Sequence, residues 1–140
     1  MTREILHDLG FFGHYLHMHT GGRGGKQFML ATLHKNGGHL TQRELLDRTN
    51  ISPAALSEVL AKLEGEELIV REPCTHDRRQ LLIELTPQGE VCAARIRAER
   101  ELFEEEALAC LTPEEQEQLK VLLDKLAVHW RHMEVKGVNA

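Results

Sequence analysis

Histidine is the residue type with the most potential for metal chemistry in this sequence. His14 and His17 are three residues apart, and so are His129 and His132. In a helix this spacing puts both imidazoles of a pair on one face, where they could share a metal ion. A zinc or haem sensor is therefore one hypothesis. No acidic residue or cysteine has a clearly matching spacing, so we favour partly exposed interface histidines and expect neither a metal nor another cofactor.

The three cysteines give little indication of redox chemistry. Cys74, Cys92 and Cys110 are an odd number at wide spacing, which excludes a disulfide scaffold and a Cys-x-x-Cys motif. We expect Cys74 beside a β-hairpin, and Cys92 and Cys110 on one long helix. A buried, inert thiol is the commoner state of such residues. Oxidation of Cys74, which would disturb the hairpin, is kept as a secondary hypothesis.

No motif in the sequence indicates an enzyme. The glycine cluster between Gly21 and Gly25 lacks the preceding strand that a phosphate-binding loop needs, and is interpreted as a linker. There is no nucleophile elbow, and no acid-base pair stands out from ordinary helix charges. We therefore expect a protein that is not an enzyme.

Composition limits the class of protein further. The 140 residues are 41% hydrophobic and 28% charged, and only one Trp, one Tyr and four Phe are aromatic. These values predict a single domain with a mainly aliphatic, helical core. No apolar run approaches the ~20 residues of a membrane span, and the first residues do not resemble a signal peptide. A cytoplasmic protein that does not contact a membrane is expected.

Charge is distributed unevenly along the chain. The net charge is -5, but residues 99–118 hold eight acidic side chains and one basic side chain. The rest of the chain is therefore close to +2. The acidic balance of the whole chain thus does not exclude a nucleic-acid partner.

Capping residues mark where the helices begin. Thr41 with Glu44 three residues on predicts a capping box, in which side chain and backbone satisfy each other's free donors. Ser52 offers a capping hydroxyl, and Pro53 is suited to the first helical position. Together with apolar spacing, these signals predict helices over the first 19 residues, over about Lys26 to Lys35, from Thr41 to the turn at Asn50, from Ser52-Pro53 to about Glu64-Gly65, from Thr86-Pro87, and from Thr112-Pro113.

A β-hairpin is predicted between the fourth and fifth helices. Residues 68–71 and 81–85 are short β-rich runs, and the segment between them is polar. The two helices that follow carry apolar residues at helical spacing. On the long helix these are Val91, Ala94, Ala98 and Leu102, and on the last helix they are Leu119, Leu122, Leu123, Leu126, Trp130 and Met133.

The order of these elements predicts a mainly α fold, a winged helix-turn-helix flanked by helices at both ends. A short helix, a turn, a second helix and a hairpin can place the second helix in the major groove of DNA, while the hairpin tip reaches the flanking backbone or minor groove. The apolar faces of the first and last helices would leave a large exposed patch on a monomer, which favours dimerisation.

The middle of the chain resembles the MarR (multiple antibiotic resistance regulator) family of transcription factors. The resemblance rests on several linked motifs at matching separations. They are Leu40-Thr41-Gln42-Arg43-Glu44-Leu45, Ile51-Ser52-Pro53-Ala54-Ala55-Leu56-Ser57 with Leu60 and Leu63-Glu64, Asp77-Arg78-Arg79, and Leu85-Thr86-Pro87-Gln88-Gly89. The resemblance implies a homodimer in which the terminal helices of the two chains interlock. It also implies a protein that typically represses its own promoter and releases DNA when a small ligand binds.

The resemblance also implies which residues contact DNA. The first two turns of the recognition helix would face base edges, with Ser57 as the best candidate for a hydrogen bond to a base and Ala54 and Ala55 near thymine methyl groups. Arg43 and Lys62 would contact phosphate. At the hairpin tip the acid would orient an arginine that enters the minor groove. The full set of expected contacts is Arg43, Ser52, Ala54, Ala55, Ser57, Glu58, Lys62, Asp77, Arg78 and Arg79.

Two positions depart from the family pattern. Glu58 stands where the family often has arginine or another polar residue, and a carboxylate facing phosphate costs affinity unless it accepts from a cytosine amine. Glu66-Glu67 stands where the family usually has a glycine before the hairpin. Residues 41–80 carry six basic and eight acidic side chains, so we expect weak, steeply salt-dependent DNA binding.

The sequence therefore predicts a homodimeric, ligand-responsive transcriptional regulator, a repressor, on a pseudo-palindromic site in double-stranded DNA. Its expected parts are an N-terminal dimerisation helix (1–20), a winged helix-turn-helix (26–88), and a long helix with a C-terminal dimerisation helix (89–140). A small-molecule effector is expected between the terminal helices and the winged module, near Tyr15, Phe28 or His14. The alternatives are a winged helix that contacts another protein and a metal-sensing regulator.

Overall fold

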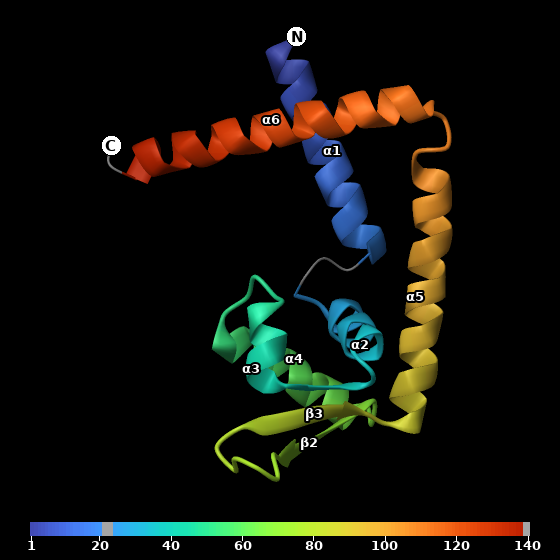
Figure 1. Ribbon diagram of the computed structural model, residues 1–140, viewed down its shortest axis with the longest axis vertical. Coiled ribbons are helices and arrows are strands. Elements are labelled where there is room, and N and C mark those ends of the chain that lie inside the picture. The colour runs from blue at the N-terminus through green and yellow to red at the C-terminus, as the bar shows by residue number, and fades with distance from the viewer. Residues whose placement is uncertain (21–23, 139–140) are drawn as a thin grey trace. The chain divides into compact units, whose positions relative to one another are not determined.

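The computed structural model describes residues 1–20 and 24–138. Gly21 and Gly22, two of the four glycines interpreted as a linker, lie outside these residues. The chain divides into two compact units, residues 1–100 and 101–140, which are described separately. The elements (Figure 1) are α1 (Thr2–Thr20), α2 (Lys26–Lys35), β1 (His39–Thr41), α3 (Gln42–Asp47), α4 (Pro53–Gly65), β2 (Ile69–Pro73), β3 (Leu81–Leu85), α5 (Pro87–Ala107) and α6 (Pro113–Val138).

The sheet of the first unit has three antiparallel strands in the order β1-β3-β2. Leu40 lies opposite Ile83, and Ile69 lies opposite Leu85. The hairpin of β2 and β3 was expected, whereas β1 was not. Gly37 and Gly38 precede β1 with φ of 83° and 93°, a left-handed conformation that favours glycine and turns the chain from α2 into the strand.

The core of the first unit is aliphatic, as the composition predicted. Side chains from α2, α3, α4, the sheet and the first half of α5 form one cluster. Its largest fully buried members are Met29, Leu33, Leu45, Leu56, Leu60, Leu63, Ile69 and Ile83. This core sets how far α3, α4 and the hairpin are rotated, and thus which of their residues are exposed.

The start of α5 packs tightly against the chain that enters the hairpin. A Cβ on Gly89 would lie 1.9 Å from the carbonyl oxygen of Leu68, so this helix can approach the strand only with glycine there. The apolar residues noted at helical spacing on α5 do not form its packed face, because Val91 and Leu102 are 74% and 60% exposed. The buried face of α5 consists of Gly89, Ala93 and Ile96.

The connection from α5 to α6 begins earlier than the sequence predicted. Cys110 does not lie on the long helix, because α5 ends at Ala107. The connection to α6 then ends in a second capping box, in which the Thr112 hydroxyl accepts from the Glu115 N–H and the Thr112 N–H donates to the Glu115 carboxylate. This box fixes the start of α6 at the position that the sequence predicted.

Helices α1 and α6 expose apolar side chains in the single chain. The exposed set on α1 includes Ile5, Leu6, Phe11, Phe12 and Leu16, and the set on α6 includes Leu119, Leu122, Leu123, Trp130 and Met133. Across the described residues, no helix combines the length and the apolar character that crossing a membrane requires.

Candidate nucleic-acid interface

The capping box predicted at Thr41 sets the start of α3. The Thr41 hydroxyl accepts from the Glu44 N–H at 3.1 Å, and the Thr41 N–H donates to the Glu44 carboxylate at 3.1 Å. The pKa of the Glu44 carboxyl is lowered below its ordinary value of 4.5. The main cause is the hydrogen bond from the Thr41 backbone N–H, and the Thr41 side chain is the second cause. The box leaves Arg43 exposed in the first turn of the helix.

Ser52 fixes the start of α4, the expected recognition helix. Its hydroxyl oxygen accepts from the Ala55 N–H at 3.1 Å, and Pro53 occupies the first helical position. Ser52 is thus a helix cap as well as an expected DNA contact. Among the other expected contacts on α4, Ala54, Glu58 and Lys62 are exposed, whereas Ala55 and Ser57 are half-buried at the edge of the exposed face.

The hairpin tip is held by backbone hydrogen bonds. The Cys74 N–H donates to the Gln80 carbonyl at 2.8 Å, and the Gln80 N–H donates to the Asp77 carbonyl at 3.0 Å. The Asp77 carboxylate accepts from the backbone N–H of Arg79 at 3.0 Å. Asp77 was expected to orient the arginine, and in the structure it contacts Arg79 through the backbone N–H.

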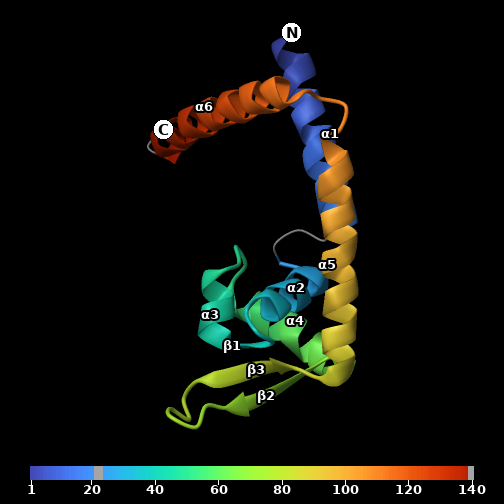
Figure 2. The same cartoon turned by 45° about the vertical axis from the view of Figure 1, so that its right-hand side comes forward.

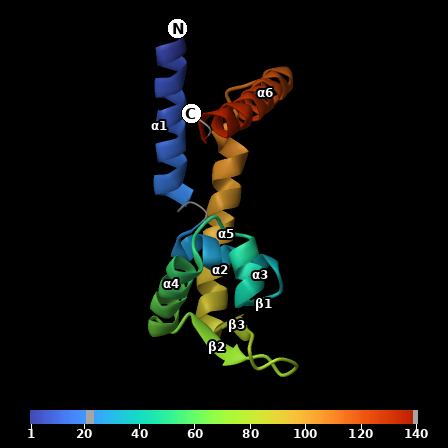
Figure 3. The same cartoon turned by 90° about the vertical axis from the view of Figure 1, so that its left-hand side faces the viewer.

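The tip projects from the module together with α3 (Figures 2 and 3). Between the first turn of α3 and the hairpin lies an open pocket of about 480 Å³, lined by Gln42, Arg43, Asp77, Arg79, Gln80 and Leu81. The structure thus brings together three expected DNA contacts, Arg43, Asp77 and Arg79, from segments far apart in the sequence. Two guanidinium groups against one carboxylate make this pocket suited to an anion such as phosphate.

The remaining expected contacts are placed outside this pocket. Ser57, Glu58 and Lys62 follow the surface of α4, and Arg78 is exposed at the hairpin tip. A smaller pocket of about 240 Å³ lies between α3 and the start of α4, and Arg43 also lines it. Arg43 therefore lies between the start of α4 and the hairpin.

Gln42 is a functional candidate that the sequence did not indicate. It lines both pockets, and its Oε1 is buried with no hydrogen-bond partner within the described part of the chain. Its place beside Arg43 was the available signal. Its burial depends on how α3 packs, which sequence spacing does not specify.

The histidine pairs of α1 and α6 have exposed side chains. Within residues 1–20 and 24–138, no group of three or more His, Cys, Asp or Glu side chains is placed to hold a metal ion. Of the residues near which an effector was expected, Phe28 packs against the core and Tyr15 stacks on His19 with ring centroids 4.0 Å apart.

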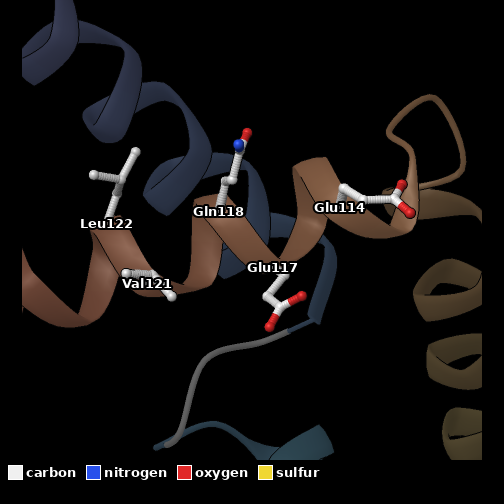
Figure 4. Close-up of a pocket in the computed structure, with 5 residues that line it drawn as sticks. All are labelled: Glu114, Glu117, Gln118, Val121 and Leu122. Atoms are coloured by element: carbon white, nitrogen blue, oxygen red, sulfur yellow. The ribbon is translucent and has the colours of Figure 1, made fainter.

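The second unit has an open pocket of its own on α6. It measures about 580 Å³ and is lined by Glu114, Glu117, Gln118, Val121 and Leu122. Figure 4 shows that the two glutamates lie toward the start of the helix and the two apolar side chains lie further along it. The pocket is therefore acidic at one end and apolar at the other.

Comparison with known proteins identifies the family. A model of the MarR family matches residues 28–80, the region from α2 to the hairpin tip. The HTH-type transcriptional repressor MdtR of Bacillus subtilis is 34% identical over 100 residues, which are 71% of this chain and 64% of MdtR. The chain thus spans less than two thirds of that relative's length.

Two solved structures extend the similarity. The YusO protein of B. subtilis is 28% identical with a TM-score of 0.60, covering 90% of this chain and 94% of YusO. A mutant of MarR from E. coli, crystallised with operator DNA, is 25% identical with a TM-score of 0.59, covering 71% of this chain and 72% of MarR. The residues that the family model matches include the caps of α3 and α4 and the arginines that line the pocket between α3 and the hairpin, and the chain belongs to the MarR family.

Proposed function

We propose that the protein is a homodimeric, ligand-responsive transcriptional repressor that binds a pseudo-palindromic operator in double-stranded DNA. The pocket shared by Arg43 and Arg79 carries the proposal, because it presents two cations from separate elements beside the exposed face of α4. Such an arrangement can hold the DNA backbone while α4 occupies the major groove. The similarity to a regulator crystallised with its operator supports DNA over a protein partner.

The residues divide by role within this proposal. Arg43 and Lys62 bind phosphate. Arg78 and Arg79 contact the DNA from the hairpin tip, and Asp77 fixes the conformation of the tip. Ser52 caps α4 beside the groove. Base edges are contacted by Ala54, Ala55, Ser57 and Glu58. In a dimer, two copies of α4 would meet half-sites about 34 to 36 Å apart, one turn of DNA.

The proposed parts are those expected from the sequence. Residues 26–88 form the DNA-binding module, while residues 1–20 and 89–140 contribute the dimerisation helices and the long helix. The exposed apolar faces of α1 and α6 support this assignment, since a monomer rarely leaves such surfaces uncovered. The effector would bind near Tyr15, Phe28 or His14, and the protein would act in the cytoplasm.

The experiment that tests the proposal is a titration of labelled DNA from the gene's own upstream region. We expect saturable binding by a dimer, with an affinity that falls steeply as salt increases. The matched control is DNA of the same length and composition in shuffled order. Equal affinity for both DNAs, or no binding at low salt, would contradict the proposal. Adding a chelator tests the metal alternative, and we expect unchanged binding.

A further inference from the structure

The rotation of α4 about its own axis places one long side chain at the centre of its exposed face. Leu56, Leu60 and Leu63 are at most 1% exposed and fix the inner face of the helix. The opposite face carries residues at the spacing of a single helical stripe. These residues are Ala54, Glu58, Ala61 and Gly65, and all four are exposed. Of these four residues, only Glu58 has a side chain longer than a methyl group. A surface that approaches this face therefore meets the Glu58 carboxylate first.

The neighbours of Glu58 allow a close approach to DNA. Ala54 and Ala61 are small, and a Cβ built on Gly65 would meet no atom within 4 Å. The Glu58 side chain is 73% exposed, and its ion-pair partner Lys62 is 4.0 Å away, at the outer limit of such a contact. The carboxylate is therefore not held in a tight pair and is free to accept a hydrogen bond from a ligand.

The chemistry of a carboxylate restricts what it can bind in the major groove. An ionised glutamate only accepts hydrogen bonds. Guanine and thymine present acceptors on their major-groove edges, and phosphate is an anion, so each of these repels it. Adenine offers a donor beside the N7 acceptor, whereas cytosine offers the N4 amine without an adjacent acceptor. Cytosine is the best match to Glu58.

We propose that Glu58 determines sequence specificity by accepting a hydrogen bond from the N4 amine of a cytosine in each half-site, an inference that rests on the proposed DNA-binding function. This contact explains how an acidic residue occupies the outermost position of a DNA-binding helix. The carboxylate meets a donor instead of the phosphate backbone, and Lys62, one turn further along α4, provides a neighbouring positive charge.

The test is selection of binding sites from a random double-stranded DNA library by four proteins. These are the wild type, Glu58→Gln, Glu58→Ala and the control Glu101→Gln, which makes the same charge change at an exposed residue of α5. We expect the wild type and the control to select one invariant cytosine per half-site. Glu58→Gln should select adenine there, because glutamine pairs with adenine N6 and N7, and Glu58→Ala should lose the preference at that position alone.

A second measurement gives the size of the effect. Replacing the selected C·G pair by T·A should weaken binding of the wild type roughly tenfold and leave the affinity of Glu58→Ala almost unchanged. Identical motifs from all four proteins would overturn the role of Glu58 while leaving the proposed function intact. If no protein, the wild type included, enriches any motif, then the proposed function itself is wrong and this inference falls with it.

Discussion

Arg79 combines two features, a charge in the pocket beside α3 and a backbone fixed by Asp77. We expect Arg79→Ala to weaken DNA binding about three- to tenfold, the effect of losing one charge-assisted contact. The loss of affinity should be similar for all DNA sequences. The slope of log affinity against log salt concentration should become shallower by about one, because one fewer phosphate contact is made. Fluorescence anisotropy at several salt concentrations measures both quantities.

The matched control for this variant is Arg95→Ala. Arg95 is an exposed arginine on α5, outside the proposed interface, so its removal changes the net charge equally. If Arg79→Ala retains wild-type affinity and an intact dimer, the hairpin tip does not contact DNA.

The two kinds of site residue differ in how well the sequence predicts them. The exposure of Arg43 and Arg79 could be predicted, because each lies next to a local signal, a capping box or a polar turn. The burial of Gln42 Oε1 could not, since it depends on contacts between α3 and segments distant in the chain. The bond from the Arg79 N–H to Asp77 depends on the turn geometry, which residue types alone leave open.

At the scale of elements, the end of α4 carries a local strain. Glu67 has φ of 61°, while its N–H donates to the Glu64 carbonyl and the Leu68 N–H donates to the Leu63 carbonyl, each at 3.0 Å. This is the Schellman pattern that helices usually complete with glycine at the left-handed position. The departure from the family's glycine at this point therefore places a non-glycine residue in an unfavourable conformation.

We expect Glu67→Gly to stabilise the fold by about 0.5–1 kcal/mol, the left-handed penalty of glutamate minus the extra chain entropy of glycine. Urea denaturation measures the change. Glu66→Gly is the control at the adjacent residue, whose φ of -85° is ordinary, and it should destabilise by at least a similar amount, because it also removes the ion pair with Lys26. A stabilising effect of both variants, or of neither, would show that backbone strain at Glu67 is not the cause.

The junction between β3 and α5 depends on the absence of a side chain at Gly89. Gly89→Ala should destabilise the protein by roughly 2–3 kcal/mol, because its methyl group would overlap the Leu68 carbonyl. Gly65→Ala, at a helical glycine with open space around it, should instead stabilise by about 0.4–1 kcal/mol. Thermal and urea unfolding compare the two. Equal effects would mean that the close approach at Gly89 relaxes at little cost.

Helix starts were predictable and sheet pairing was not. A cap involves residues within three positions of each other, so Thr41, Ser52 and Thr112 could be identified directly. Strand β1 has three residues and exists because it pairs with β3, more than 40 positions away. The packed face of α5 was missed for the same reason, since it depends on the fit of Gly89 against Leu68.

At the scale of the whole molecule, the exposed apolar side chains of α1 and α6 predict a dimer. Phe12 on α1 and Leu122 on α6 are each 59% exposed. We expect the wild type to sediment as a dimer at micromolar concentration, and the double variant Phe12→Glu, Leu122→Glu to sediment as a folded monomer with weakened operator binding.

Val91→Glu is the control for this experiment. Val91 is 74% exposed on α5, and the variant makes the same kind of substitution, an exposed apolar residue to glutamate, once and outside α1 and α6. It should remain dimeric. Dissociation of both variants, or of neither, would contradict the assignment of α1 and α6 to the interface.

The strand order β1-β3-β2 gives the sheet two edge strands, and its hairpin is a proposed DNA contact that has to remain accessible. Unpaired edges invite sheets to join between molecules and to aggregate. Here each edge has its own protection. β1 is only three residues long, and β2 ends in Pro73, which has no N–H to donate, after the charged Arg71 and Glu72. The hairpin can therefore remain exposed and available for its partner without promoting the self-association that would remove the protein from solution.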